Sequence, residues 1–200
     1  MKIYLIRHTD ADDDRRDSFG GITDDPLIEE GREYAKSIGK LLIDENIELI
    51  YTSPYKRATE TAKIINEVLN VNIIELYNLR ERNSYGVVSG IEKDRAMILF
   101  PSIYRRIQEM KSKGEKPSTS RETLPGGEIY LDLLLRAEDA FTHIMRESKL
   151  KNCQKIVIIS HGGFFWAFFN DVIKIPMDLK KGEIIILKGD ELSSLRIIQE

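Results

Sequence analysis

Cysteine is almost absent from this sequence, in which Cys153 is the only thiol among 200 residues. A single cysteine excludes a disulfide framework and a thiolate zinc site within the chain, and we expect a reducing, cytoplasmic setting. Long apolar runs are absent as well. The most apolar stretch, residues 156–169, is interrupted by polar residues and glycines, which makes it too short for a membrane span of roughly 20 residues. The apolar stretch 3–6 is also too short for a signal peptide.

An excess of charge of one sign is missing too. The formal net charge is −3, from 30 basic and 33 acidic residues, so the chain lacks the electrostatic footprint of a nucleic-acid-binding protein. An anionic ligand would therefore need a local cluster of positive charge. The hydrophobic fraction of 42% and the charged fraction of 32% are ordinary for a globular protein, and 200 residues can bury a full core in one domain.

The spacing of apolar residues predicts strands that alternate with helices. Ser53 and Pro54 are expected to be the N-cap and the first residue of the second helix. This alternation predicts an α/β fold with three layers, α/β/α, in which a mostly parallel central sheet has antiparallel edge strands. The expected strands are 2–6, 47–51, 72–76, 155–160, 183–187 and 194–198, and the expected helices are 29–44, 53–69, 128–149 and an aromatic-rich helix after residue 163.

Residues 77–127 form the least regular part of the chain. They hold a loop with glycines at both ends, a helical stretch broken at Pro101, and a polar linker. We expect this excursion to cover a site like a cap or lid, within a single domain that spans residues 1–200.

Three predicted strands end in polar groups that a protein core rejects. Arg7 and His8 follow the first strand, Arg57 lies in the first turn after the second, and His161 follows the fourth. Because ligands bind beyond the carboxyl ends of parallel strands, these side chains are expected to meet in one crevice. Two guanidiniums and two imidazoles suit a phosphoryl dianion. For each residue alone, a surface ion pair, a structural histidine or a tight turn is the alternative.

Other polar and aromatic features have simpler interpretations. The aspartate-rich stretch 10–17 is interpreted as a solvated loop, and no metal site is expected. Arg15, in that loop, would either contact a second anionic group of a ligand or pair with the neighbouring aspartates. His143 is expected on the surface, and the aromatic cluster 164–169 is expected to pack in the core.

Several motifs, in order along the chain, resemble the histidine phosphatase superfamily, which contains cofactor-dependent phosphoglycerate mutases and many small phosphatases. The motifs are Ile-Arg-His-Thr at 6–9, Ser-Pro-Tyr-Lys-Arg-Ala-Thr-Glu-Thr-Ala at 53–62, Pro-Gly-Gly-Glu at 125–128 and Ser-His-Gly-Gly at 160–163. Thr9 stands where the family usually has glycine. The resemblance covers residues 3 to about 170 and implies a fold like that of phosphoglycerate mutase.

The resemblance also implies roles for the residues at the strand ends. His8 would attack phosphorus and form a phosphohistidine, while Arg7, Arg57 and His161 would hold the phosphoryl oxygens. The residues expected to contact substrate are Arg7, Thr9, Arg15, Ser53, Arg57, Lys93 and Gly162.

A glutamate is implied as the general acid. The family carries it in a Leu-x-Glu segment before a glycine-bounded loop, which here corresponds to Glu81 before Gly86. One extra residue stands between the two, which leaves Glu75 and Glu92 as alternatives to Glu81. An exposed loop carboxylate without a catalytic role is a further interpretation.

The sequence favours a phosphatase that hydrolyses a small phosphomonoester. A cofactor-dependent phosphoglycerate mutase is the first alternative, supported by segment 81–86, Lys93 and the pair 105–106, while the short linker 111–127 argues against it. A phospholigand-binding protein without activity is the second. No cofactor is expected, apart from a bisphosphorylated primer in the case of a mutase. The expected partner is a small phosphorylated substrate, with neither nucleic acid nor membrane involved, and a homodimer is left open.

Overall fold

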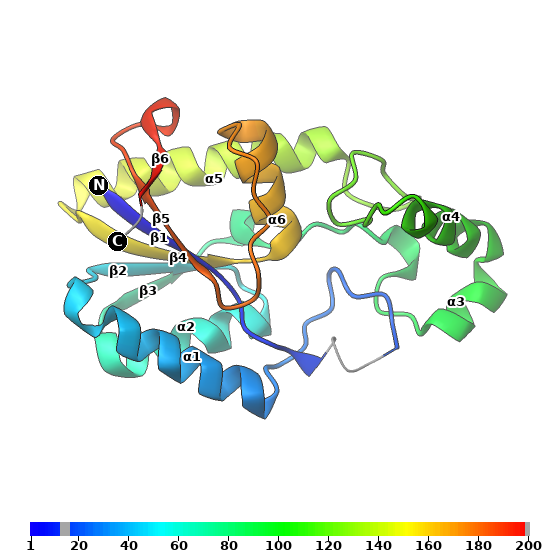
Figure 1. The fold of residues 1–200 in the computed structure, drawn as a ribbon, viewed down its shortest axis with the longest axis horizontal. Coiled ribbons are helices and arrows are strands. Elements are labelled where there is room, and N and C mark those ends of the chain that lie inside the picture. Colours follow the sequence, from blue (N-terminus) through cyan, green and yellow to red (C-terminus); the bar gives the residue numbers. More distant parts are fainter. Residues whose placement is uncertain (13–16, 199–200) are drawn as a thin grey trace.

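The computed structural model describes residues 1–12 and 17–198. In that part of the chain, six strands form one mixed sheet in the order β3-β2-β4-β1-β5-β6 (Figure 1). The first four strands along the chain pair in parallel, whereas β5 and β6 pair antiparallel at one edge. The predicted sheet is therefore confirmed. The strands are β1 (Lys2–Arg7), β2 (Leu49–Thr52), β3 (Asn72–Glu75), β4 (Lys155–Ser160), β5 (Ile184–Lys188) and β6 (Arg196–Ile198).

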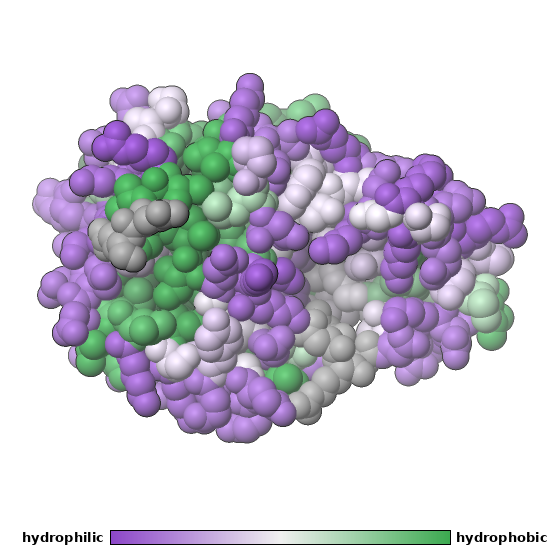
Figure 2. Space-filling model, in the orientation of Figure 1, coloured by the Kyte–Doolittle hydropathy of each residue, from purple (hydrophilic) through white to green (hydrophobic). Residues whose placement is uncertain are grey.

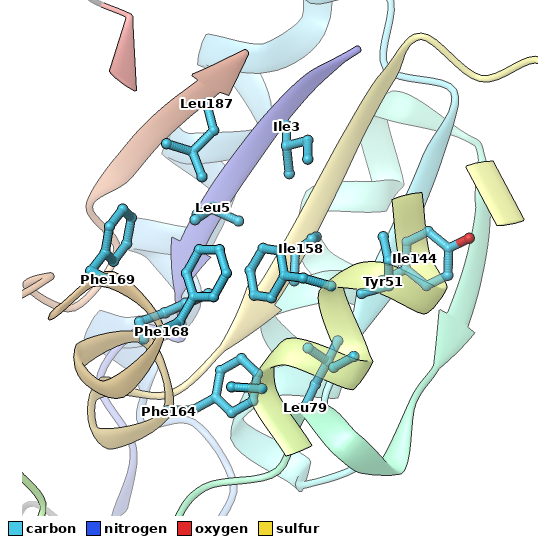
Figure 3. Packing of buried hydrophobic residues seen from close by; sticks show 14 of the residues in the cluster. Ile3, Leu5, Tyr51, Leu79, Ile144, Ile158, Phe164, Phe168, Phe169 and Leu187 are labelled. Carbon is cyan, nitrogen blue, oxygen red and sulfur yellow. The ribbon is translucent and has the colours of Figure 1, made fainter. Parts of the chain in front are cut away.

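Helices cover both faces of the sheet, because alternate side chains of each strand point to opposite sides. On β1, Tyr4 and Ile6 pack with α1 (Glu29–Leu42) and α2 (Lys56–Leu69). Ile3 and Leu5 pack with α5 (Tyr130–Leu150) and α6 (Gly162–Ala167) on the other face (Figure 3). These two clusters make the three-layer α/β/α architecture, as the sequence predicted.

The aromatic residues that follow β4 belong to the core. Phe164 and Phe165 lie on α6, and Phe168 and Phe169 lie in the π-helical turn η5 (Phe168–Val172) that continues it. All four are fully buried, and Figure 3 shows that Phe164, Phe168 and Phe169 point toward the sheet. Their predicted role in packing is confirmed.

The predicted starts of the second helix and of the last strand are wrong, and the structure gives a physical reason for each. Helix α2 begins at Lys56 with Tyr55 as N-cap, so Ser53 is not the cap and Pro54 is not the first helical residue. The Ser53 hydroxyl lies 2.7 Å from Nε2 of His161, a residue distant in the sequence. Strand β6 begins at Arg196 because a short 3₁₀ turn, η6 (Leu192–Ser194), precedes it. The remaining boundaries differ from the predictions by a few residues, as helix and strand ends often do.

The excursion 77–127 contains four short helical elements, and the two longer ones, α3 and α4, lie to one side of the sheet (Figure 1). Phe19, from the loop after β1, is buried in a small apolar cluster made mainly by residues of this excursion. The excursion and the loop after β1 therefore share a core of their own. The elements are η3 (Tyr77–Leu79), η4 (Gly86–Val88), α3 (Lys93–Leu99) and α4 (Pro101–Ser112).

The hydropathy of the surface differs between the two ends of the molecule. Apolar residues gather over the β5–β6 edge of the sheet, whereas the part that contains α3 and α4 is mostly polar (Figure 2). Across residues 1–12 and 17–198, helices long and apolar enough to cross a membrane are not found.

Candidate active site

The carboxyl ends of three neighbouring strands lie at one edge of the sheet. Arg7 pairs with Ser160 across β1 and β4, and the N–H of His8 donates to the Ser160 carbonyl at 3.0 Å. His8 and His161 therefore follow adjacent strands, and their ring centroids are 5.0 Å apart. Arg57, in the first turn of α2, places Nε 3.2 Å from Nε2 of His8 and 3.2 Å from Nδ1 of His161. The structure thus brings together the side chains that the sequence placed at these strand ends.

A cavity of about 250 Å³ opens beside these groups. A larger one of about 480 Å³ lies between α5 and the turn before β6, but it is lined by neither histidine nor arginine. The chemistry that the histidines and arginines can perform therefore belongs to the smaller cavity. Its lining residues are Arg7, His8, Ser18, Gly20, Gly21, Arg57, Glu81, Ser84, Tyr85, Ser118 and Lys181.

The backbone carbonyl of Thr9 fixes the tautomer of His8. Nδ1 of His8 lies 2.8 Å from that carbonyl oxygen, which can only accept, so Nδ1 carries the proton and Nε2 keeps its lone pair. The Thr9 side chain faces Thr61 of α2, with 3.4 Å between the two hydroxyl oxygens. Thr9 is fully buried and lies outside the cavity lining, and its carbonyl orients His8. Its contact with substrate stays a prediction.

Both imidazoles are held in the neutral form. Burial, followed by the positive charge of Arg57, lowers the pKa of His8 well below its usual range. The same two causes, in the same order, lower the pKa of His161. A neutral imidazole is the form that can act as a nucleophile or accept a hydrogen bond.

These lowered pKa values predict a fold that loses stability in mild acid. In the unfolded chain His8 and His161 take up protons near pH 6.5, whereas in the folded chain they stay neutral until lower pH. The unfolded state therefore binds more protons as pH falls, and each histidine lowers the free energy of unfolding by up to about 1.4 kcal/mol per pH unit. Urea unfolding at pH 7.5, 6.5 and 5.5 measures this slope. A free energy of unfolding that does not change with pH over this range would contradict the prediction. The His8→Asn variant should show about half the pH dependence of the wild type.

The two arginines are fixed by backbone carbonyls. Arg57 donates from Nη1 to the Thr23 carbonyl and from Nη2 to the Gly21 carbonyl at 2.9 Å. Arg7 donates from Nη1 to the Leu179 carbonyl at 2.9 Å, while its buried Nε has no hydrogen-bond partner in the described structure. A buried donor of this kind is rare unless something meets it, and beside this cavity it fits an oxyanion.

Gly162 makes room for Arg7. A Cβ atom at position 162 would lie 2.8 Å from Cζ of Arg7, so a larger residue would displace the guanidinium. Gly162 does not line the cavity. The structure therefore indicates an effect of Gly162 on the site through Arg7, and its predicted contact with substrate stays a prediction.

Glu81 lines the cavity, and its carboxylate is held by three backbone N–H groups. Oε1 accepts from Arg82 at 2.8 Å and from Phe164 at 3.1 Å, and Oε2 accepts from Gly163 at 3.1 Å. A Cβ atom at Gly163 would lie 2.7 Å from Oε1, so the second glycine after His161 permits this approach. The alternative carboxylates do not line the cavity, because Glu75 lies in β3 and Glu92 precedes α3.

Two buried arginines fix the loop that carries Glu81. Arg82 is fully buried, and it donates to four backbone carbonyls of segment 117–128. Arg136 on α5 forms a bidentate ion pair with Glu128 and donates to the Asn78 and Arg80 carbonyls at 2.8 and 2.9 Å. Arg82 belongs to segment 81–86, which pointed to a mutase in the sequence, and the structure shows that its guanidinium is buried among backbone carbonyls.

Of the three remaining residues predicted to contact substrate, two have described positions. Ser53 is buried outside the cavity lining, and its hydroxyl orients His161 as described above. Lys93 forms an ion pair with Asp17 and does not line the cavity, because the loop after β1 supplies a nearer carboxylate. Arg15 lies outside the described residues, and so does the part of the aspartate-rich loop around it. Groups of three or more potential metal-ligating side chains are not found in the described ranges.

Several lining residues were not identified from the sequence. They lie on loops, where periodicity carries no signal, and none belongs to a motif with a phosphate-binding pattern of its own. The missed residues are Ser18, Gly20, Gly21, Ser118 and Lys181, whereas Ser84 and Tyr85 fall in segment 81–86, which pointed to a mutase.

The chain belongs to the histidine phosphatase superfamily (branch 1), whose family model matches residues 3–195. It is 28% identical over 171 residues to the uncharacterized phosphatase PhoE of Bacillus subtilis, covering 85% of this chain and 76% of that protein. It is 29% identical over 187 residues to a 2,3-bisphosphoglycerate-dependent phosphoglycerate mutase of Parvibaculum lavamentivorans, covering 88% of this chain and 81% of the mutase.

The fold has close counterparts among solved structures. Bacillus stearothermophilus YhfR superimposes with a TM-score of 0.79 at 23% identity, over 98% of this chain and 94% of that one. The family model confirms the predicted family, and the superposition confirms the predicted phosphoglycerate mutase-like fold. The family's phosphatases and mutases support an enzyme here as well.

Proposed function

We propose that this protein is a phosphatase that hydrolyses a small phosphomonoester through a phosphohistidine on His8. The observation that carries the proposal is the orientation of His8. Its Nδ1–H donates to the Thr9 carbonyl, and its Nε2 lies beside Arg57. His8 itself lines the cavity. A neutral, fixed imidazole next to a guanidinium is suited to attack a phosphoryl group.

In the first step, Nε2 of His8 forms a bond to phosphorus as the bond to the leaving oxygen breaks. Glu81, protonated at the start, gives its proton to that oxygen, and the free alcohol departs. Arg7 and Arg57 hold the equatorial oxygens, where the negative charge of the transition state is carried. His161 would join them by donating from Nδ1, in the tautomer whose Nε2 accepts from the Ser53 hydroxyl. Arg57 Nε lies 3.2 Å from both imidazoles, and we propose that it also donates to a phosphoryl oxygen of the bound substrate.

In the second step, water attacks the phosphohistidine. The Glu81 carboxylate takes a proton from this water, phosphate forms, and the bond between phosphorus and Nε2 breaks. His8 returns to its neutral tautomer because the Thr9 carbonyl still holds the proton on Nδ1. Glu81 is protonated again and ready for the next substrate. The fixed guanidiniums supply the positive charge for both steps, so the activity is proposed to be independent of metal ions.

Two cationic side chains of the excursion favour hydrolysis over mutase chemistry, because both are engaged in ion pairs away from the cavity. Lys93 and Arg106 are among the residues that pointed to a mutase in the sequence. In the structure Lys93 pairs with Asp17, and Arg106 pairs with Glu122 and Glu109. Neither lines the cavity, so neither is placed to hold the second substrate of a phosphoryl exchange.

A phosphate-release screen tests the proposal. Phosphosugars, phosphoglycerates, nucleotides and phosphopeptides are incubated with the protein in EDTA, with His8→Ala as the control. Release that survives EDTA and is abolished in the variant supports the phosphatase. Interconversion of 3-phosphoglycerate and 2-phosphoglycerate that requires a bisphosphorylated primer would establish the mutase instead. Binding of inorganic phosphate without turnover of any ester would indicate a protein that only binds phospholigands.

A further inference from the structure

Four side chains with hydroxyl groups line the cavity in addition to the charged groups of the candidate active site. They come from three parts of the chain, namely the loop after β1, the loop between η3 and η4, and the segment after α4. Segments far apart in the sequence therefore bring hydroxyl groups to the space beside the reacting groups. The residues are Ser18, Ser84, Tyr85 and Ser118.

These four hydroxyl groups have no hydrogen-bond partner among residues 1–12 and 17–198. Ser84 is the clearest case, because the residue is 5% exposed, yet its Oγ is not among the fully enclosed polar atoms. Since Ser84 lines the cavity, this remaining exposure of the hydroxyl lies toward the cavity. Polar groups in such buried residues are normally paired, so an unpaired hydroxyl at this position indicates a group that a ligand completes.

The positions of Ser84 and Ser118 are fixed by the buried Arg82. Its guanidinium donates to the carbonyls of Pro117 and Ser120, which lie on either side of Ser118 in the sequence. The Ser84 N–H donates to the Arg82 carbonyl at 2.9 Å. Because one buried residue holds both segments, the two serines need little ordering when a ligand binds.

Tyr85 and Ser18 are held by the small apolar cluster of the excursion. The Tyr85 ring packs against Phe19 with 5.2 Å between the ring centroids, and Ser18 precedes this phenylalanine in the sequence. Burial raises the pKa of Tyr85, so its phenol stays protonated at neutral pH and can donate as well as accept. These two residues therefore add fixed donors and acceptors from a second packed unit.

The chemical character of the lining favours a neutral group that carries hydroxyls. A hydroxyl offers one donor and two acceptor sites, and a ligand hydroxyl can use both kinds. In the part of the chain that the structure describes, no Val, Leu, Ile or Met side chain lines the cavity, so an alkyl group gains little there. The ammonium of Lys181, which also lines the cavity, pairs with Asp10 at 3.4 Å.

We propose that these four hydroxyl groups bind the hydroxyls of the leaving group, so that the preferred substrates are phosphate monoesters of small, neutral polyols. This inference rests on the proposed phosphatase function and specifies its substrate class. The cavity volume of about 250 Å³ lies below the roughly 300–1,000 Å³ of most ligand pockets, so the polyol is small. Ser84 is then a specificity-determining residue, and it lies in the interval 81–86, where the sequence has one residue more than the family pattern.

The test compares three-carbon esters that differ in the number of hydroxyls. The leaving group of propyl phosphate has no further hydroxyl, that of 3-hydroxypropyl phosphate has one, and that of glycerol 3-phosphate has two. A neutral hydrogen bond changes kcat/KM by roughly 2- to 12-fold, so kcat/KM of the wild type should rise along this series by roughly 5- to 150-fold. 3-Phosphoglycerate, in which a carboxylate replaces one hydroxymethyl group, should not exceed glycerol 3-phosphate.

Serine substitutions assign the effect to the lining of the cavity. Ser84→Ala is expected to lower the ratio of kcat/KM for glycerol 3-phosphate to kcat/KM for propyl phosphate by roughly 2- to 12-fold, mainly through KM. The triple variant Ser18→Ala/Ser84→Ala/Ser118→Ala should lose most of the preference. Ser102→Ala is the matched control, because Ser102 is exposed on α4 outside the cavity, and it should keep the ratio of the wild type.

Three results would overturn the inference. They are a wild-type protein that hydrolyses propyl phosphate and glycerol 3-phosphate equally well, a preference that survives in the triple variant, and a higher kcat/KM for 3-phosphoglycerate than for glycerol 3-phosphate. All three leave His8-dependent hydrolysis in place. Activity that persists in His8→Ala would instead overturn the phosphatase mechanism, so the two failures are distinguishable. Calorimetry with His8→Ala tests the hydroxyl contacts without turnover, and glycerol 3-phosphate should bind more tightly than propyl phosphate.

Discussion

Replacing His8 by alanine is expected to lower kcat for phosphate release by about 10⁴-fold or more, since the loss of a catalytic nucleophile typically has an effect of this size. The structure gives His8 the properties of a nucleophile, with a neutral ring, a proton held on Nδ1 by the Thr9 carbonyl, and Nε2 beside Arg57. The neighbouring imidazole of His161 does not line the cavity, and its Nε2 lies 2.7 Å from the Ser53 hydroxyl. Steady-state phosphate release measures the effect.

Two further measurements make the His8 experiment specific. Added imidazole should restore part of the activity of His8→Ala, because the deleted ring leaves a space of its own size beside Arg57. Rapid quenching of the wild type with a ³²P-labelled substrate should trap a phosphoramidate that is stable in base and labile in acid. Binding of inorganic phosphate by the variant serves as the control for folding. Activity within tenfold of the wild type would remove His8 as the nucleophile.

Replacing Arg57 by alanine is expected to lower kcat/KM by about 10³-fold, within the range found when an arginine that stabilises a phosphoryl transition state is lost. Arg57 contacts both imidazoles through Nε and two backbone carbonyls through its Nη atoms. Arg57→Lys is expected to recover only a small part, because an ammonium cannot reproduce the planar fork of a guanidinium. Lys56→Ala, at the exposed neighbouring position, is the matched control and should keep the activity of the wild type.

The Arg57 variant also has a readout that does not depend on turnover. The charge of Arg57 is the second cause, after burial, that lowers the pKa of both His8 and His161. Removal of this charge should therefore raise the pKa of both imidazoles, and NMR titration of the ring protons measures the change. Two unchanged pKa values in Arg57→Ala would contradict the electrostatic role, even if activity is lost.

Sequence motifs alone did not decide which glutamate lies at the candidate active site. The extra residue before Gly86 left the register of the general acid open between three glutamates, all of them in or beside irregular segments. The structure places Glu81 on the cavity, where the backbone N–H groups of Gly163 and Phe164 at the start of α6 donate to its carboxylate. That contact joins the excursion to the segment after His161, and no local pattern encodes it.

The order of apolar and polar residues was sufficient to predict the α/β class, the mixed sheet, and the meeting of Arg7, His8, Arg57 and His161. These predictions succeed because side-chain periodicity follows from strand and helix geometry, and because parallel strands end at one edge of the sheet. Ser53, Lys93 and Lys181 show where such reasoning stops. Ser53 bonds to His161 instead of capping its own helix, Lys93 pairs with Asp17, and Lys181 enters the cavity from a distant turn. Their positions depend on loops packed by contacts between segments far apart in the chain, which only the folded molecule brings together.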